Sequence, residues 1–268
     1  MRPCTYCRQR GFTMFELIVI LALLTVLLGF FLPLVQKIRK EAARIQCANN
    51  LHQLTLAAID CADTTNGKMP PAVGSYTNAK SEGTFHFYLL PYLGQDNVYK
   101  NAEDGAGNFI VWHNNTQAVQ IKTFLCPSDS SSGKAPLYQD WLGLTNYACN
   151  YMGFGNKKAR FPQDFPDGVS NTMFFAERYQ MCNGTPTGWG YSGETEWAPV
   201  FAYSSYAKFQ VHPPQSDCNP SVPQSIHNGG IQVGIGDGSV RTVSPAITAR
   251  TWLLATDPAD GQPLGSDW

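Results

Sequence analysis

The sequence is poor in charged residues. Asp, Glu, Lys and Arg make up only 15% of its 268 residues, and the formal net charge at pH 7 is −1. Soluble domains usually carry about 25% of such residues. A chain with so little net charge has no general electrostatic attraction for a phosphate backbone, so a nucleic-acid partner is not expected.

The sequence also lacks the short motifs of common enzymes. It contains no Gly-x-Ser-x-Gly elbow, no His-Glu-x-x-His motif and no phosphate-binding loop. No internal repeat or long low-complexity stretch is present, and Cys4-x-x-Cys7 has no second pair to complete a zinc site. These absences favour a protein that is not an enzyme and that needs no cofactor.

Apolar residues, glycine and proline are plentiful. Hydrophobic residues make up 43% of the chain, which is enough for a sizeable core, and there are 24 Gly and 18 Pro. Such a composition is typical of a turn-rich β protein and not of a helical bundle. We expect one globular domain preceded by an extended N-terminal element.

The strongest pattern lies at the N-terminus. Residues 1–11 carry Arg2, Arg8 and Arg10 and no acid, and Leu17–Gln36 is a run of 20 residues without a charge. A helix of that length spans about 30 Å, the apolar thickness of a bilayer. No small-residue cleavage site follows the run, as it would in a secretory signal. The expected processing point lies before the run, between Gly11 and Phe12.

An acidic residue interrupts this apolar segment. The stretch reads Gly11-Phe12-Thr13-Met14-Phe15-Glu16, and a carboxylate close to a membrane is costly and usually functional. Here the chain resembles the type IV prepilins, which share Gly-Phe-Thr-x-x-Glu before about twenty apolar residues. The resemblance implies that a prepilin peptidase removes leader 1–11 and methylates the Phe12 amine. It also implies that Glu16 pairs with this amine in a neighbouring subunit.

The same resemblance implies a location and partners. Residues 12–36 would form a transmembrane and assembly helix, crossing the inner (cytoplasmic) membrane once and placing the C-terminal domain in the periplasm or outside the cell. The partners would be the peptidase, an inner-membrane assembly platform and other pilin or pseudopilin subunits. The alternative is a plain single-span anchor with Glu16 at the membrane interface.

Residues 37–66 are predicted to form an amphipathic helix. An apolar stripe recurs at helical spacing, at Cys47, Leu51, Leu54, Ala58 and Cys61. In pilins this part of the helix packs against a sheet. Cys47 and Cys61 would lie about 21 Å apart along such a helix. They are therefore too distant to bond each other, and each must face a cysteine of the domain or stay free.

The eight cysteines suggest disulfides in an oxidising compartment. Removal of the leader would also remove Cys4 and Cys7, which have no evident role. The disulfide candidates are the six that remain, Cys47, Cys61, Cys126, Cys149, Cys182 and Cys218. Six cysteines allow 15 pairings, and the sequence does not choose among them. Buried free thiols are the alternative.

Residues 67–268 are expected to form an extracytoplasmic, antiparallel β-rich domain with long loops, so the fold class is α+β. Short apolar or aromatic runs alternate there with turn residues. The runs with strand character include 84–90, 121–125, 146–152, 173–176 and 231–235. Between strand-like runs at 231–243, Asp237-Gly238 predicts a tight hairpin with a primed turn.

A second resemblance covers nearly the whole chain. Nine residues separate His227 from Asp237-Gly238, as in a large planctomycete-type family of unknown function. Its members join a prepilin N-terminus to a domain ending in His-x9-Asp-Gly. The other matching stretches are 46–51, 124–129, 145–147 and 167–172, with Glu177. Since the activity of that family is unknown, the resemblance implies a fold and a location but no chemistry.

Two groups of polar residues are weak site candidates. His227 and Asp237 could be metal ligands or an acid–base pair, but a turn-capping histidine and a turn aspartate are the favoured interpretation. Asp167 and Asn171 offer oxygen ligands for Ca²⁺, which some secretion pseudopilins bind in C-terminal loops. A turn stabilised by their side chains is again favoured.

Three kinds of function remain open on the sequence alone. The first is a structural subunit of a filament or of a type II secretion pseudopilus, in which Phe12 and Glu16 carry assembly. The second is an envelope binding module for glycans or proteins that uses the prepilin segment only for export and anchoring. An envelope enzyme is the third, and no motif supports it.

Overall fold

The computed structural model describes residue 11 and residues 13–76, 80–133, 137–155, 159–193 and 195–268. Within these ranges, the side chains at positions 28, 30, 32 and 33 are not described. The chain divides into two compact units, Met1–Ala42 and Ala43–Trp268. The first helix, α1 (Met14–Thr64), contributes residues to both units.

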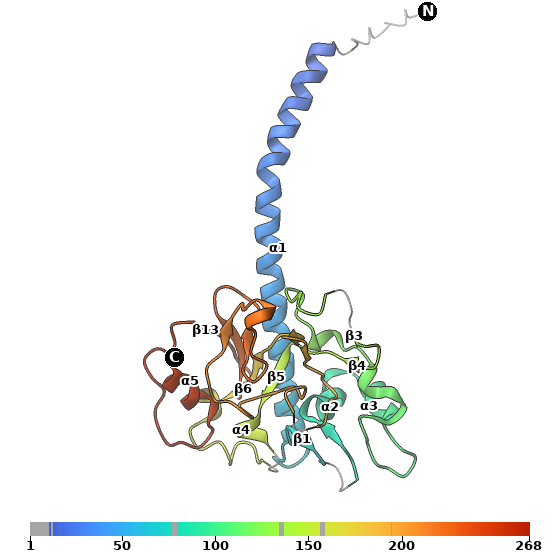
Figure 1. Cartoon of the computed structure of the whole chain (residues 1–268), viewed down its shortest axis with the longest axis vertical. Coiled ribbons are helices and arrows are strands. Elements are labelled where there is room, and N and C mark those ends of the chain that lie inside the picture. Colours follow the sequence, from blue (N-terminus) through green and yellow to red (C-terminus); the bar gives the residue numbers. More distant parts are fainter. Residues whose placement is uncertain (1–10, 12, 77–79, 134–136, 156–158, 194) are drawn as a thin grey trace, which may run out of the picture. The chain divides into compact units, whose positions relative to one another are not determined.

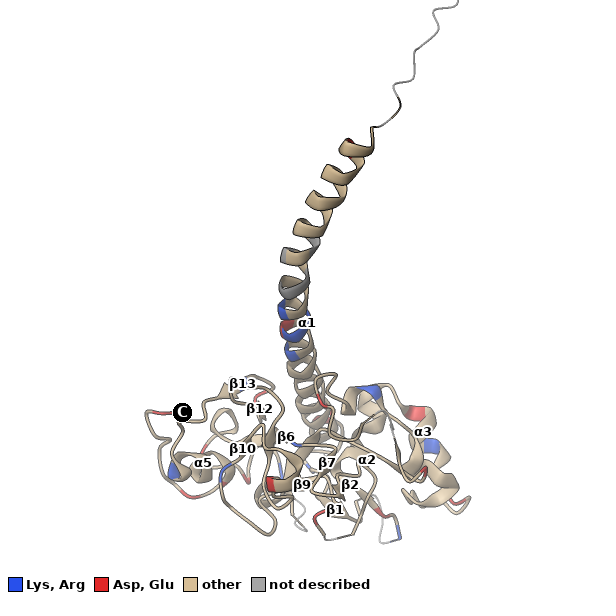
Figure 2. Cartoon of the chain, turned by 45° about the horizontal axis from the view of Figure 1, so that its top comes forward, with Lys and Arg blue, Asp and Glu red and all other residues tan. Residues whose placement is uncertain are grey.

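The described part of the N-terminal unit is mainly helical. Its apolar side chains are exposed along α1, among them Leu17, Leu21 and Leu24. In the part of the chain that the structure describes, no helix is both long enough and apolar enough to cross a membrane. The apolar stretch is followed by a band of Lys and Arg on α1, which includes Lys37 and Arg39 (Figure 2).

The globular unit begins with the second part of α1, whose apolar stripe is buried as the sequence predicts. Cys47, Leu51, Leu54, Ala58 and Cys61 all have 0% exposed surface. The helix ends at Thr64, before the expected position 66. Asn66 adopts a left-handed conformation with φ 57°, and the Gly67 N–H then donates to the Ala62 carbonyl at 2.7 Å. This arrangement satisfies a terminal carbonyl of the helix.

A five-stranded sheet lies beside this part of α1, in the order β13-β12-β6-β5-β9 (Figure 1). Its strands are β5 (Tyr147–Asn150), β6 (Met173–Glu177), β9 (Val200–Phe201), β12 (Ile231–Ile235) and β13 (Val240–Val243). All neighbours pair antiparallel except β5 and β9, which are parallel. The fold is therefore α+β, with a helix packed on a β-rich domain, as predicted.

Both faces of the sheet are covered, and a glycine allows α1 to approach closely. On one face, Ile231 and Val233 pack with Trp252 of α5 (Ala249–Thr256). On the other face, a Cβ at Gly234 would lie 2.6 Å from Thr55 Cγ2 of α1. A side chain at position 234 would therefore force the helix and the sheet apart.

The remaining elements are short. The other α-helices are α2 (Phe85–Leu89), α3 (Asp96–Asn101) and α4 (Tyr151–Phe154). Short 3-10 helices span His113–Ala118, Lys122–Phe124, Val169–Asn171 and Gln215–Asp217, and Leu90–Leu93 continues α2. Two-residue strands form the pairs β1 (Val73–Gly74) with β2 (Gly83–Thr84), β3 (Leu137–Tyr138) with β4 (Leu142–Gly143), β7 (Met181–Cys182) with β8 (Thr185–Pro186), and β10 (Gln210–Val211) with β11 (Gln224–Ser225).

Two of the expected strands are helical. The run 84–90 forms α2 because the Thr84 hydroxyl accepts a hydrogen bond from the Phe87 N–H at 3.1 Å and caps a helix there. The run 121–125 contains the 3-10 helix Lys122–Phe124. Strands do form at 173–177 and 231–235, where the apolar runs are buried in the sheet.

A buried arginine just after β6 joins β9 and the segment before it to the loop before β11. Arg178 is 2% exposed. Its guanidinium donates to four backbone carbonyls at 2.6–3.1 Å, those of Glu196, Ala198, Val200 and Pro220. Burial lowers the pKa of this guanidinium to about 10, so it stays protonated at neutral pH.

We predict that Arg178→Lys destabilises the domain by about 2–4 kcal/mol. A lysine ammonium cannot donate to all four carbonyls that the guanidinium reaches, and the carbonyls left without a hydrogen bond remain buried. The measurement is the free energy of unfolding from denaturant titration. Arg250→Lys is the matched control, since Arg250 is exposed and its guanidinium donates to the exposed side chain of Gln262. It should change stability by less than about 0.5 kcal/mol, and equal effects of the two substitutions would contradict the prediction.

A buried histidine gives the domain an acid sensitivity. His86 is fully buried against the rings of Phe124 and Phe175, whose centroids lie 5.1 and 5.8 Å from its own. Neither ring nitrogen has a hydrogen bond of good geometry with the described residues. Burial lowers the pKa of His86 to about 3, so the folded chain holds this imidazole neutral.

The imidazole of His86 binds a proton more readily in the unfolded chain than in the folded one. The contribution of His86 to the free energy of unfolding is therefore fully present above pH about 6.5 and is lost as the pH falls toward about 3. We expect His86 to account for a loss of about 2–3 kcal/mol between pH 7 and pH 4.5. Denaturant titrations of the wild type and of His86→Leu at both pH values measure this contribution as the difference between their pH dependences. Identical pH dependences would contradict it.

Candidate functional site

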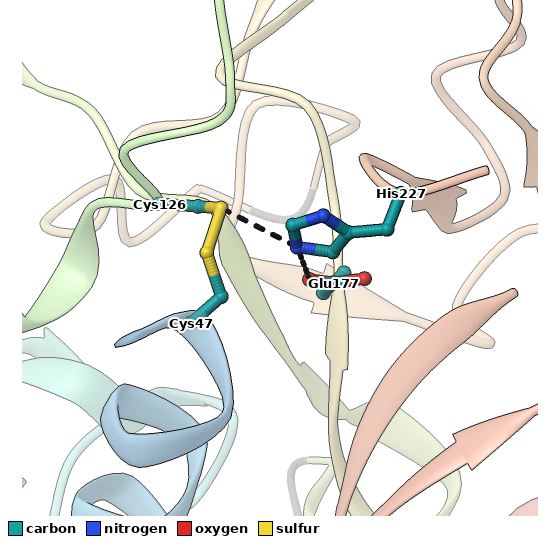
Figure 3. Close-up of side chains that lie close together, drawn as sticks. All are labelled: Cys47, Cys126, Glu177 and His227. Carbon is teal, nitrogen blue, oxygen red and sulfur yellow. Dashed lines mark hydrogen bonds and ion pairs between the residues drawn. A yellow bond between two sulfur atoms is a disulfide. The ribbon is translucent and has the colours of Figure 1, made fainter. Parts of the chain in front are cut away.

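Four side chains of three chemical types meet inside the globular unit (Figure 3). Cys47 comes from α1, and Cys126 follows the 3-10 helix Lys122–Phe124. Glu177 is the last residue of β6, and His227 lies in the turn between β11 and β12. One ligand atom from each of the four residues lies within 4.8 Å of all the others.

A disulfide forms one side of this cluster. Cys47 and Cys126 are bonded across 79 positions of sequence, which ties α1 to the segment before β5. The backbone of that segment is also held by two asparagines. The Cys126 N–H donates to Asn146 Oδ1 at 2.7 Å, and Asn50 Nδ2 of α1 donates to the Leu125 carbonyl at 2.8 Å.

A buried carboxylate and an imidazole form the other side. Glu177 Oε1 lies 3.2 Å from His227 Nε2, with side-chain exposures of 0% and 10%. Glu177 Oε2 accepts a hydrogen bond from the Gln232 N–H at 2.9 Å. Oε1 accepts no hydrogen bond of good geometry from the described residues. Burial raises the pKa of Glu177, and the nearby imidazole opposes that rise.

The loop that carries His227 is built around a glycine and a serine. The Ser225 hydroxyl accepts from the His227 N–H at 3.2 Å and lies 2.6 Å from the carbonyl oxygens of His227 and Gly230. Gly230 has φ 125°, and a Cβ there would lie 2.2 Å from the Val243 carbonyl oxygen. The position therefore requires glycine.

The arrangement differs from a catalytic triad. His227 Nε2 faces both Glu177 Oε1 and Cys126 Sγ, the latter at 3.8 Å. A triad would use one ring nitrogen for the carboxylate and the other for the nucleophile. Sulfur, nitrogen and oxygen atoms of the kinds that bind metals instead lie within 4.8 Å of one another, with the two sulfur atoms bonded to each other.

Asp237 and Gly238 lie in a hairpin and are not part of this cluster. Asp237 Oδ1 accepts from the Ser239 N–H at 2.9 Å. The Gly238 N–H donates to the Ile235 carbonyl, and Gly238 itself has φ 90°. The prediction of a primed turn is therefore wrong. Of the loop residues 236–238, only Gly238 has a positive φ, whereas a two-residue primed turn at Asp237-Gly238 would begin with a positive φ at Asp237. The loop is a three-residue connection of the bulged kind.

Asp167, one of the two calcium candidates, binds the backbone of the C-terminal segment at residues 260 and 261. The two carboxylate oxygens of Asp167 accept from the backbone N–H groups of Asp260 and Gly261 at 2.7 and 3.0 Å. Asn171 Nδ2 donates to the Asp167 carbonyl at 2.8 Å. The oxygens of Asp167 thus already bond backbone and side-chain amides.

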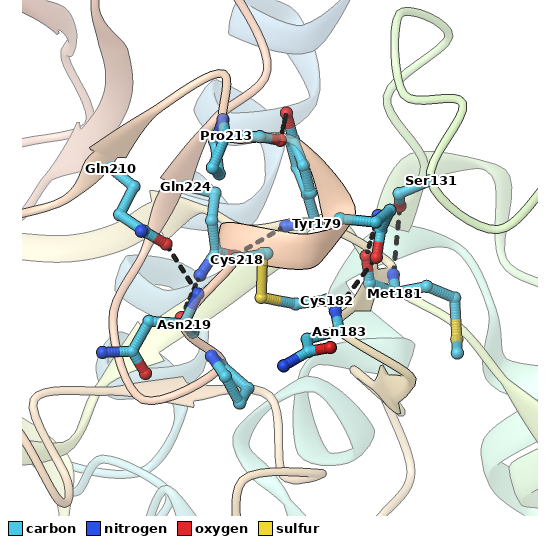
Figure 4. The surroundings of a disulfide bond; sticks show 12 residues. Ser131, Tyr179, Met181, Cys182, Asn183, Gln210, Pro213, Cys218, Asn219 and Gln224 are labelled. Carbon is cyan, nitrogen blue, oxygen red and sulfur yellow. Dashed lines mark hydrogen bonds between the residues drawn. A yellow bond between two sulfur atoms is a disulfide. The ribbon is translucent and has the colours of Figure 1, made fainter.

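The cysteine candidates divide into bonded and free residues. Besides Cys47–Cys126, Cys182 of β7 bonds Cys218 across 36 positions, beside the hydrogen bond from Gln224 to Asn219 (Figure 4). Cys61 and Cys149 are buried free thiols, so the expectation of disulfides is wrong for these two. Cys61 lies on the same stripe of α1 as Cys47 but 14 residues further along the helix, and its sulfur atom lies 3.6 Å from the Tyr76 hydroxyl. Cys4 and Cys7 lie outside the described residues.

At the N-terminus, Glu16 caps its own helix. Glu16 Oε2 accepts from the Thr13 N–H at 2.8 Å, and the Glu16 N–H donates to the Thr13 hydroxyl at 3.3 Å. This is the reciprocal pattern of a capping box, which the spacing Thr-x-x-Glu predicts and which the sequence analysis missed. Gly11 is exposed, and the processing residue Phe12 lies outside the described residues.

Comparison with known families places these observations in a class. Residues 6–32 match the prokaryotic N-terminal methylation motif, the signature of proteins processed as prepilins. Residues 36–250 match the family described as "Protein of unknown function (DUF1559)". The match covers more than half of the chain, so the protein belongs to that family, joined to a prepilin-type N-terminus. No curated protein and no solved structure matches the chain.

The cysteine pattern predicts a definite thiol count. Labelling of the unreduced, denatured chain should find two thiols, Cys61 and Cys149, if it begins at Phe12. It should find four if Cys4 and Cys7 remain as thiols. In the native state Cys61 and Cys149 should resist labelling, because burial raises the pKa of both thiols and shields their sulfur atoms. Six thiols in the mature denatured chain would contradict both disulfides.

Proposed function

We propose that this chain is a non-enzymatic pilin-like subunit that assembles through α1 into a filament or a type II secretion-type pseudopilus. The observation that carries the proposal is the N-terminal methylation motif at 6–32. That motif implies processing by a prepilin peptidase between Gly11 and Phe12. Its partners are then the peptidase, an inner-membrane assembly platform and other pilin or pseudopilin subunits.

The exposed apolar surface of α1 supports assembly with other copies of this helix. Leu17, Ile18, Leu21 and Leu24 are each about half exposed in the single chain. Exposed apolar surface of this extent usually marks contact with a protein or a membrane. In the proposal the segment 12–36 holds the subunit at the inner membrane, with the globular unit on the outer side. After assembly, the segment 12–36 packs against the same segment of neighbouring subunits.

The charge on Glu16 supports the same role. In the single chain its carboxylate bonds the backbone N–H of Thr13. In an assembly, the methylated amine of Phe12 from a neighbouring subunit would compete for this carboxylate. Two opposite charges that leave water together cost less than either charge alone. Charge pairing and helix capping are different roles, and substitutions can separate them.

We expect Glu16→Gln to abolish assembly and to leave cleavage after Gly11 intact. Glutamine can still accept the Thr13 hydrogen bond and keep the capping box, but it carries no charge. N-terminal mass analysis measures cleavage, and the amount of chain recovered in sheared surface filaments or in an overexpressed pseudopilus measures assembly. Glu41→Gln is the matched control on the same helix.

If Glu16→Gln assembles as well as the wild type and only Glu16→Ala fails, the role of Glu16 is capping and the charge-pairing mechanism is wrong. If both variants assemble normally, the subunit proposal itself loses its basis in Glu16. The Glu41 control should assemble at the wild-type level.

A binding module is the second candidate function, and one cavity favours it. A hollow of about 840 Å³ in the globular unit is lined by Tyr151, Tyr203 and Tyr206 together with Asp164 and Asp257. Aromatic faces beside carboxylates are suited to carbohydrate ligands. In this role the prepilin segment would serve export and anchoring only, and Glu16→Gln would leave ligand binding unchanged.

A further inference from the structure

The buried cluster of Cys47, Cys126, Glu177 and His227 has a use that filament assembly does not require. We propose that these four side chains bind one Zn²⁺ when Cys47 and Cys126 are thiols, so that metal and disulfide are alternative cross-links at the same place. The proposal is independent of the proposed function, since it concerns the globular unit and does not involve the N-terminal segment.

The donor set suits zinc. Two thiolates, one imidazole nitrogen and one carboxylate oxygen complete four-coordinate zinc in the manner of closed structural sites. With Zn–S bonds of about 2.3 Å, two thiolates in a tetrahedral site lie about 3.8 Å apart. With the disulfide formed, the four ligand atoms lie within 4.8 Å of one another, and reduction would allow the two bonded sulfur atoms to separate to the distance that zinc requires. Thiolate sulfur also disfavours Ca²⁺ and Mg²⁺, which prefer oxygen ligands.

Glu177 supplies the independent observation that points to a ligand. It is fully buried, and one of its oxygens is held by the Gln232 N–H. The other, Oε1, lies within 4.8 Å of the two sulfur atoms and 3.2 Å from His227 Nε2, and it accepts no hydrogen bond of good geometry from the described residues. A buried carboxylate oxygen whose one close polar contact is poorly aligned is under-satisfied, which is costly. A cation between Oε1, Nε2 and the sulfur atoms would satisfy it.

His227 is oriented for the same role. Its Nε2 lies 3.2 Å from the carboxylate oxygen and 3.8 Å from Cys126 Sγ. One ring nitrogen aimed at two acceptors can donate only one proton. The same nitrogen, deprotonated, can donate its lone pair to a metal that both neighbours also bind.

The oxidation state of the cysteines decides which cross-link forms. In the disulfide each sulfur is bonded to the other and cannot act as a thiolate ligand. In the dithiol state, which precedes disulfide formation in a new chain, zinc binding releases one proton from each thiol. Either cross-link joins α1 to the segment that carries Cys126. A zinc-bound chain would therefore keep these segments together before oxidation.

The experiment uses the full chain in detergent with Cys4 and Cys7 replaced by serine, so that the leader offers no thiols. A phosphine reduces the disulfides, taking oxygen from water to become the phosphine oxide and leaving two thiols per bond. The chain is reduced with one equivalent of Zn²⁺ present, desalted and analysed for metal. We expect about one zinc per reduced chain and none per oxidised chain. Co²⁺ in place of zinc should give thiolate charge-transfer absorption and the visible bands of four-coordinate cobalt.

Variants locate the ligands. Cys47→Ser/Cys126→Ser should bind no zinc, whereas Cys182→Ser/Cys218→Ser should bind the wild-type amount, because those cysteines belong to no comparable cluster among the described residues. Glu177→Gln and His227→Gln should each weaken zinc binding at least about tenfold. His52→Gln is the histidine control, since His52 is exposed and lies outside the cluster.

Several results would overturn the proposal. These are a reduced wild-type chain without zinc, an oxidised chain that binds as much zinc as the reduced one, and a Cys47→Ser/Cys126→Ser variant that keeps the metal. A chain that unfolds on reduction and does not refold with one equivalent of zinc, as judged by tryptophan fluorescence, would overturn it as well.

Discussion

The contact between the apolar stripe of α1 and the central sheet is the constraint on which the rest of the globular unit depends. The stripe from Cys47 to Cys61 is completely buried, and the sheet approaches α1 closely at Gly234, which has no side chain of its own to hold Thr55 away. This close approach places Cys47 beside Glu177 at the end of β6. The disulfide to Cys126 then fixes the segment that leads into β5. The candidate site is thus a product of helix-on-sheet packing.

The sequence was sufficient for those elements whose pattern is local. The stripe of α1 has a helical period that only burial on one face explains, and β6 and β12 are apolar runs long enough for a buried strand. The run 84–90 was misassigned because a single hydroxyl, that of Thr84, caps a helix there. The hairpin was placed correctly, but its turn type depends on backbone angles at Gly236 and Asp237 that residue type alone does not determine.

The candidate site was harder to predict, because its members meet only through tertiary structure. The sequence singles out His227 by its spacing from Asp237, yet the residue that it contacts is Glu177, 50 positions earlier. The two residues come together because β6 and β12 pair with Ala176 opposite Val233. One local signal was available, a glutamate ending the apolar run Met-Phe-Phe-Ala. The choice of Cys126 among possible partners of Cys47 depends on the same packing, which composition and spacing do not encode.

The position of the Cys47–Cys126 bond has a mechanical consequence. Tension applied along α1 from the N-terminal unit enters the globular unit at Ala43, only four positions before Cys47. The first strong attachment that this load meets is therefore covalent, and it passes into the chain at Cys126. The noncovalent contacts of Leu51, Leu54 and Ala58 lie beyond that bond and are shielded from peeling. Peeling of α1 from the sheet between Cys47 and Thr64 would therefore require cleavage of a covalent bond, whereas the chain after Cys126 is held against the same load by noncovalent contacts and by the Cys182–Cys218 bond.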